Sequence, residues 1–252
     1  PKAGGPGATW IPFGILAAWD GGNNPTDNFI QKHDKAFQVT RVPPDNPKGE
    51  ITDGGEGQAT ITSSWYLLIK YAKITPSSFI CKGDPGVSPF KFQKYRTRAR
   101  EMQACFDFGG GEASPLFRGE VVPYPGECVS YAYNMPYSDG ISSFAVSDIF
   151  GPGAPIAADR NPYLDSQLTS TDIENNGGNS GNHRLKGQNV LYKNLSVSFE
   201  RTPLVGTGQD NIYRFGGDPT QDPDGSTAPT ENGMGAPISQ HDSYLVSERN
   251  ER

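Results

Sequence analysis

Glycine and proline interrupt this chain so often that long helices cannot make up most of it. The 252 residues include 31 glycines and 22 prolines, together about a fifth of the chain. Proline lacks a backbone donor and glycine is entropically costly inside a helix, so both favour turns and short strands. The rest of the composition, 34% hydrophobic and 20% charged, is typical of a folded protein, and the length fits one large domain or two small ones.

The clearest helix is predicted over residues 63–73. One of two serines at its start can cap it, and Pro76 follows its end. The apolar residues that share one face of this helix are Trp65, Leu68, Ile69 and Ala72. Shorter helices are expected over residues 27–37 and 92–102.

Strands are expected where apolar residues alternate or run between turn signals. Residues 78–84 read as a strand that enters a turn, and residues 154–163 as an interior strand. A half-buried strand is indicated by the alternation of Val129, Tyr131 and Tyr133. The polar stretch over residues 168–181 is expected to be a mobile loop.

A β-hairpin is the most regular pattern in the sequence. Its first strand carries Val190 and Tyr192 on one face, and its turn is expected at Lys193 and Asn194. In its second strand, polar residues alternate with Leu195, Val197 and Phe199. This period of two predicts a hairpin with one apolar face.

The charge balance argues against a nucleic-acid partner. The formal net charge is −6, and the only basic cluster, residues 94–100, reads as the solvated face of a short helix. The longest apolar stretch, residues 10–19, contains Pro12 and Gly14 and is far shorter than the roughly 20 residues that span a bilayer.

Residues 178–181, Gly-Asn-Ser-Gly, resemble the nucleophile motif of chymotrypsin-like serine proteases. The candidate base, His33, lacks the surroundings in which that family carries its histidine, so Ser180 is not expected to be catalytic. The three histidines, His33, His183 and His241, are expected to be hydrogen-bonding loop residues. Paired carboxylates for glycoside hydrolysis need no local motif, and the sequence leaves that chemistry open.

An acidic segment near the C-terminus suggests a Ca²⁺ site. Asp222, Asp224 and Glu231 take the third, fifth and twelfth positions of an EF-hand-type loop, and Gly225 takes the sixth. Thr220 departs from the rule at the first position, and nearby prolines forbid the flanking helices. A solvated acidic loop is the alternative. There is no Cys-x-x-Cys motif, so a zinc knuckle is not expected.

The segment from residue 179 onwards, NSGNHRLKGQNVLYKNLSVSFERTPLVG followed by DNIY, resembles the C-terminal block of bacterial prepilin-type cleavage/methylation proteins. These are relatives of the type II secretion major pseudopilin. Further similar blocks occur in the same order: PKAGGPGATW, SSWYLLIKYAKITPSSFICKGD, FDFG, CVSYAYNMPY and IAADRNPY. The Asp-Gly-His that the family carries at the hairpin tip is absent, so no role of that tip carries over.

The resemblance implies an α+β, pilin-like head with an antiparallel sheet, short helices and long Gly/Pro-rich loops. It would be one domain over residues 1–252, with an N-terminal loop over 1–25 and an acidic tail over 215–252. The implied function is that of a non-enzymatic, self-assembling filament subunit in the bacterial cell envelope or extracellular space, without a certain cofactor. Contact with a membrane is expected only through the family's N-terminal helix, which this sequence lacks.

The resemblance also implies a disulfide between Cys81 and Cys128, which leaves Cys105 free. In the family the long helix covers one face of the sheet. Here part of that face is expected to be covered by Trp10, Phe13, Ile15 and Leu16, and the remainder to meet other subunits. The alternative function is an extracellular binding or hydrolytic module acting on polysaccharide or another surface polymer. A groove that exposes Trp10, Trp19 and Trp65 would favour it.

Overall fold

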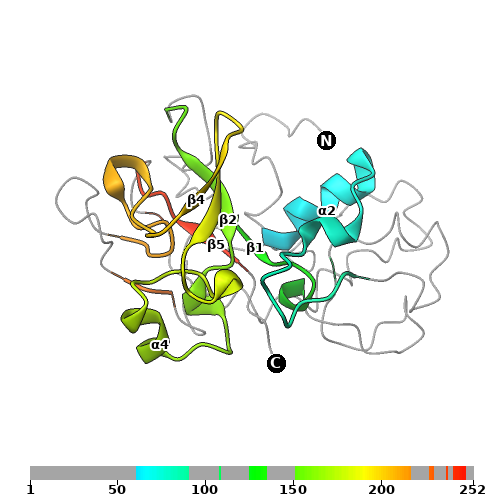
Figure 1. Cartoon of the computed structure of the whole chain (residues 1–252). Helices are drawn as coiled ribbons and strands as arrows, with labels where there is room; N and C mark the ends of the chain where they lie inside the picture. The colour runs from blue at the N-terminus through cyan, green and yellow to red at the C-terminus, as the bar shows by residue number, and fades with distance from the viewer. Residues whose placement is uncertain are drawn as a thin grey trace, which may run out of the picture.

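The computed structural model describes residues 61–90, 108, 125–134, 151–216, 227–229, 237 and 241–247 (Figure 1). They form a five-stranded antiparallel sheet with short helices, which confirms the predicted α+β class. The strand order is β4-β3-β2-β1-β5. The strands are β1 (Tyr131–Asn134), β2 (Pro155–Asp159), β3 (Gln188–Tyr192), β4 (Val197–Glu200) and β5 (Leu245–Val246). Among the described helices, none is long and apolar enough to cross a membrane.

Helix α2 (Ile61–Ala72) confirms the main predicted helix and part of its predicted apolar face, since Trp65 and Ile69 pack partly buried against the core. Thr62 and Tyr66 are buried, while Leu68 is 41% exposed and Ala72 is exposed. The helix begins two residues earlier than predicted, so residues 63 and 64 lie within it and not at its start. The buried face is selected by aromatic side chains that lie far away in the sequence.

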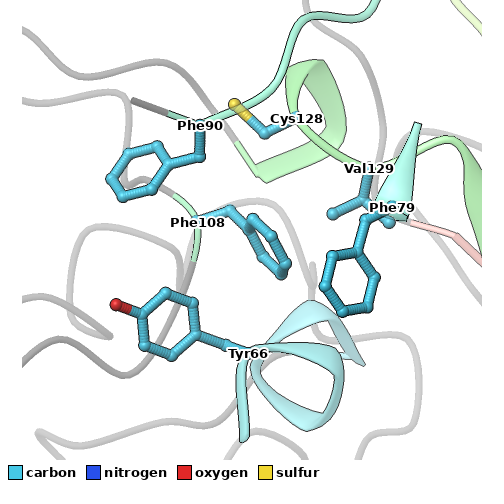
Figure 2. Close-up of a cluster of buried hydrophobic side chains, with 6 residues drawn as sticks. All are labelled: Tyr66, Phe79, Phe90, Phe108, Cys128 and Val129. Carbon is cyan, nitrogen blue, oxygen red and sulfur yellow. The ribbon is translucent and has the colours of Figure 1, made fainter. Parts of the chain in front are cut away.

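Those side chains form an aromatic cluster, shown in Figure 2. Its buried members are Tyr66, Phe79, Phe90, Phe108, Cys128 and Val129. Phe108 is fully buried at its centre, with ring centroids 5.5 Å from Tyr66 and 5.2 Å from Phe79 in edge-to-face geometry. The cluster packs α2 against the segment that leads into β1.

A second core lies on the sheet itself and is built from small side chains. Ala132 of β1, Ala158 of β2 and Val190 of β3 are buried side by side. Ile212 and Tyr213 pack against them from the segment that follows β4. Small residues on the central strands allow this segment to approach the sheet closely.

Two predicted segments differ from the structure. Residues 78–84 are not a strand: Pro76–Phe79 form a 3₁₀ turn (η4), because proline starts such a turn readily. The predicted loop over residues 168–181 contains helix α4 (Ser170–Asn175). A reciprocal capping box stabilises its start, in which Asp172 N donates to Thr169 Oγ1 at 3.1 Å and Thr169 N donates to Asp172 Oδ2 at 3.0 Å.

The predicted β3–β4 hairpin is confirmed, but the prediction of one apolar face is wrong. A two-residue turn would pair Val190 with Val197. The observed loop has three residues, so Val190 pairs with Ser198 and Leu191 pairs with Val197. A slip of one residue moves every side chain of a strand to the other face. Val190 is therefore buried on one side of the sheet, and Val197 and Phe199 lie on the other.

The hairpin tip is braced against the loop that precedes β2. Lys193 N donates to Ala154 O at 2.8 Å, and Asn194 N donates to Pro152 O at 3.0 Å. Leu195 completes the loop with a left-handed backbone, φ 67°, a position that glycine usually occupies in three-residue hairpin loops. The structure thus explains how the turn forms without a glycine.

Candidate functional site

Ser180 precedes the short 3₁₀ turn η9 (Gly181–His183) and His183 ends it, but they do not form a nucleophile–base pair. Ser180 is fully buried, and its Oγ accepts a hydrogen bond from Asn182 N at 3.4 Å as the N-cap of the turn. The ring of His183 lies beside a thiol and a carboxylate instead. The protease-like motif is therefore a structural cap.

Three side chains from distant segments converge at this point. His183 Nε2 lies 3.0 Å from Asp159 Oδ2 and 3.6 Å from Cys81 Sγ. Cys81 follows η4, Asp159 ends β2, and His183 ends η9. One ligand atom from each residue lies within 4.8 Å of the other two. We call these three residues the Cys–Asp–His cluster.

The close approach of the two loops that carry Cys81 and His183 depends on Gly83. A Cβ at this position would overlap the carbonyl oxygen of Asn182 and lie 3.1 Å from His183 Nδ1. The Gly83 N–H also donates to Cys81 Sγ at 3.3 Å, which favours a thiolate. Glycine is required at position 83 because the backbone of Asn182 lies so close to it. The backbone of Gly83 itself is not in the left-handed region.

Asp159 is fully buried and is held by amide donors. Asn182 Nδ2 donates to its Oδ1 at 3.1 Å and to Ser130 O at 2.9 Å. The Asn189 backbone N–H donates to Oδ2 at 2.6 Å. Burial raises the pKa of Asp159, and the Asn189 N–H and the nearby His183 oppose that rise. The carboxylate is thus fixed in position within a site of low polarity.

The environment of Cys81 favours the neutral thiol. Burial raises its pKa, the Gly83 N–H opposes this, and the nearby negative charges of Asp159 and Asp84 raise it further. The same surroundings act on Tyr131, whose pKa is raised to about 12 by burial first and then by the charges of Cys81, Asp159 and Asp84. A thiol with a raised pKa is a poor nucleophile at neutral pH.

The geometry of the cluster also differs from a catalytic triad. In a triad, one ring nitrogen of the histidine faces the nucleophile and the other faces the acid. Here both Cys81 Sγ and Asp159 Oδ2 lie near the same nitrogen, Nε2 of His183. The arrangement cannot relay a proton through the ring, but it resembles a set of ligands directed at one point.

A buried ion pair lies next to the cluster. Arg160 Nη2 donates to Gly126 O at 2.7 Å, to Val129 O, and to Asp84 Oδ2 at 3.4 Å. The two charged side chains are 1% and 7% exposed. This pair joins the turn that carries Cys81 to the end of β2.

A surface of different character borders the cluster on the hairpin. Leu195, Val197 and Phe199 are 79%, 65% and 46% exposed. We call these three residues the hairpin face. The ring of Phe199 meets that of His183 edge to face, at a centroid distance of 5.5 Å. Strand β4 is the edge strand of the described sheet.

The predicted disulfide is not present. Cys81 and Cys128 are both buried and are not joined. Cys81 Sγ faces His183, whereas Cys128 packs in the aromatic cluster beside Phe90 and Phe108, so the two sulfur atoms have different surroundings (Figure 2). The third cysteine, Cys105, which is predicted to be free, lies outside the described residues.

Other predicted residues also lie outside the described ranges. These are the acidic residues Asp222, Asp224 and Glu231, together with His33, Trp10, Phe13, Ile15, Leu16 and Trp19. His241 is described and exposed. The Ca²⁺ site therefore stays a prediction.

Sequence reasoning missed that Cys81 and Asp159 meet His183. The residues lie 78 and 24 positions apart along the chain, and no motif has such spacing. The available signal was Asp159 at the end of an apolar strand, where a charged residue needs partners if it is buried. Comparison with known proteins supplies no relative: no family model, curated protein or solved structure matches the chain.

Proposed function

We propose that this chain is a non-enzymatic structural subunit of a pilus-like filament outside the cytoplasm, in the bacterial cell envelope or the extracellular space. The observation that carries the proposal is the hairpin face: the apolar side chains of Val197 and Phe199 on the edge strand β4 and of Leu195 in the adjoining loop are exposed together. Exposed apolar residues that gather on one surface usually mark an interaction site. An edge strand also offers unpaired backbone groups to a neighbouring chain.

The occupant proposed for this face is a second copy of the chain. The hairpin belongs to the segment that most resembles pseudopilins, which are self-assembling subunits. Full burial of a Leu, Val or Phe side chain contributes about 1.5–3 kcal/mol, so three of them are enough to favour association substantially. If the hairpin face meets a different surface of the next copy, the contact is heterologous and repeats as a helical filament.

The backbone at Leu195 adds support. Its left-handed conformation costs a non-glycine residue roughly 1–2 kcal/mol, and its side chain is 79% exposed. Within one chain, neither feature stabilises the fold. Both are accounted for if the leucine side chain is buried by a neighbouring subunit.

The polysaccharide-binding or hydrolytic alternative receives less support. Trp65, the described member of the three tryptophans that a groove would need, packs against Phe79 at 5.9 Å and Tyr133 at 5.1 Å between ring centroids. It contributes to the aromatic cluster rather than to an open groove. Acyl transfer also needs a histidine with one ring nitrogen facing the nucleophile and the other facing the acid, whereas in the Cys–Asp–His cluster both partners lie near Nε2.

The sharpest test replaces Leu195 with glycine in the full chain. Leu195→Gly removes backbone strain and should raise the free energy of unfolding by up to about 1 kcal/mol. It also removes an apolar side chain from the hairpin face, so it should weaken self-association at least tenfold. Sedimentation equilibrium and electron microscopy measure assembly, and urea unfolding measures stability. Weaker assembly by a more stable fold cannot be attributed to misfolding.

The matched control is Tyr71→Ser, which removes a side chain of similar exposure, 75%, from α2. It should leave assembly within about twofold of the wild type. A wild-type protein that remains monomeric and forms no polymer would refute the proposal. So would a Leu195→Gly protein that assembles as well as the wild type.

A further inference from the structure

We propose that Cys81, Asp159 and His183 form a Zn²⁺ site. This inference is independent of filament formation. The chemistry of the three donors is the first reason: thiolate sulfur, imidazole nitrogen and carboxylate oxygen are the ligands that zinc uses in proteins. Ca²⁺ and Mg²⁺ prefer sites made only of oxygen.

The spacing of the donor atoms is the second reason. Zinc bonds of about 2.0–2.3 Å in tetrahedral geometry place neighbouring ligand atoms about 3.3–3.8 Å apart. Cys81 Sγ lies 3.6 Å from His183 Nε2, and Asp159 Oδ2 lies 3.0 Å from it. Small side-chain shifts bring all three atoms to bonding distance from one central ion.

The third reason is that, with the Asp159 carboxylate ionised as a metal ligand requires, no placement of protons satisfies His183 Nε2. Asn189 Nδ2, a donor, lies 2.8 Å from it, so Nε2 must accept there. Asp159 Oδ2, which already accepts from the Asn189 N–H, lies 3.0 Å from the same nitrogen, where Nε2 must donate. Turning the Asn189 amide would place its oxygen against Asp159 Oδ2 instead, since its Nδ2 is 3.2 Å from that atom. A cation between the donors removes this conflict.

The surroundings supply the support that zinc ligands normally have. The Gly83 N–H donates to the sulfur at 3.3 Å, and Asn182 Nδ2 donates to Asp159 Oδ1 at 3.1 Å. Asp159 Oδ2 accepts from the Asn189 backbone N–H and keeps a second lone pair for the ion. Asn182 is in turn anchored to Ser130 O. Zinc binding breaks the contact of Asn189 with Nε2, and the turned amide can then offer its oxygen to the ion.

The burial of the three residues indicates how the ion reaches the site. The Asp159 side chain is 0% exposed, whereas that of His183 is 29% exposed. The ion therefore enters past His183, and three protein ligands leave a fourth position for water or the Asn189 oxygen. Because the ligands come from three separate segments, the ion would join the turn at Cys81, the sheet and η9, and binding would raise the thermal stability of the chain.

The test uses the full chain, freed of metal with a chelator and confirmed as folded by circular dichroism. Titration with ZnCl₂ should give one bound ion per chain and a higher melting temperature. Titration with CoCl₂ should give the near-ultraviolet thiolate-to-cobalt absorption and the visible bands of a tetrahedral site. His183→Ala and Cys81→Ser should each weaken binding at least about 100-fold, and Cys81→Ser should abolish the thiolate absorption.

Two controls remove the same chemical groups elsewhere. Cys128→Ala removes a buried thiol in the aromatic cluster, and His241→Ala removes an exposed imidazole. Both should bind within about twofold of the wild type. The proposal is overturned if the folded wild type binds no Zn²⁺. It is overturned as well if Co²⁺ binds without thiolate absorption, because the ion would then be held by carboxylates, such as those of the acidic tail. It is also overturned if His183→Ala binds as tightly as the wild type.

Discussion

The end of β2 and the edge strand β4 distribute polarity in opposite ways. At the end of β2, Asp159, Arg160 and Asn161 are consecutive and fully buried. On β4, Val197 and Phe199 are largely exposed. Charged residues are rarely buried unless they are paired, and large apolar residues rarely gather on the surface without a reason. The chain thus places polar groups inside and apolar groups outside within one small sheet.

The buried polar residues at the end of β2 and the exposed apolar residues on β4 have different physical origins. Two of these buried polar residues bond to partners within the chain: Asp159 accepts from the Asn182 and Asn189 donors, and Asn161 donates to Tyr213 O and Leu245 O at 3.0 Å each. The exposed apolar residues have no such compensation within the described chain. We therefore expect changes at the buried polar end to affect folding, and changes at the hairpin face to affect association.

The largest effect is expected from Arg160→Met. This change leaves the Asp84 carboxylate and two carbonyl oxygens without their buried cation, and it should lower the free energy of unfolding by about 3–5 kcal/mol. Urea denaturation measures the loss. The double change Arg160→Met with Asp84→Leu removes both charges and should recover part of it. A loss below about 1 kcal/mol for the single change would show that the pair is not important for stability.

Gly83→Ala should lower the free energy of unfolding by up to about 3 kcal/mol. The added methyl group meets the backbone of Asn182, so the two loops that carry Cys81 and His183 must separate. Gly151→Ala is the matched control, because a Cβ there has nothing within 4 Å and should leave stability unchanged or slightly higher. Equal effects of the two changes would contradict the close approach.

The hairpin allows the same substitution to be made on both sides of the sheet. Val190→Ala removes a fully buried side chain and should cost about 2 kcal/mol. Val197→Ala removes a side chain that is 65% exposed and should cost less than about 0.5 kcal/mol. Chemical unfolding of both variants compares them directly. A cost at Val197 as large as that at Val190 would indicate the two-residue turn, which pairs the two valines on one face.

The smallest effect concerns pH. Burial, together with the hydrogen bond that Tyr192 donates to Glu200 at 3.0 Å, raises the pKa of Tyr192 above its ordinary value. The tyrosine pKa is therefore higher in the folded chain than in the unfolded one. Its contribution to stability is complete below the ordinary tyrosine pKa of about 10 and is lost as the pH rises above it. Tyr192→Phe should reduce the fall in the free energy of unfolding as the pH rises above about 10. If this pH dependence is unchanged in the variant, residues other than Tyr192 cause it.

The sequence predicted elements well where the period of apolar residues is regular. The alternation around Val190 and Val197 located the hairpin, and the apolar run ending at Asp159 located the central strand. The register failed because it depends on one extra loop residue, Leu195, whose left-handed backbone is not a typical choice for leucine. Helix α4 was predictable in principle, since Thr169 and Asp172 have the spacing of a capping box.

The candidate site was far less predictable than the fold. His183 was expected to be a hydrogen-bonding loop residue, and its partners were not predicted, because they are set by the docking of three separate loops and strands. The disulfide was inferred from a resemblance, and a pairing of that kind depends on the direction of each side chain. Cys81 and Cys128 differ in that direction, which local sequence does not encode.

The bracing of the hairpin tip affects how fast and how tightly the chain can associate. Lys193 N and Asn194 N are already bonded to the loop before β2, and Asn194 Oδ1 accepts from Ser196 N at 2.9 Å. A partner that docks on the tip does not need to order it first, so little conformational entropy is lost on contact. Rigid-body docking of this kind favours rapid association and leaves the lifetime of the contact to set its affinity.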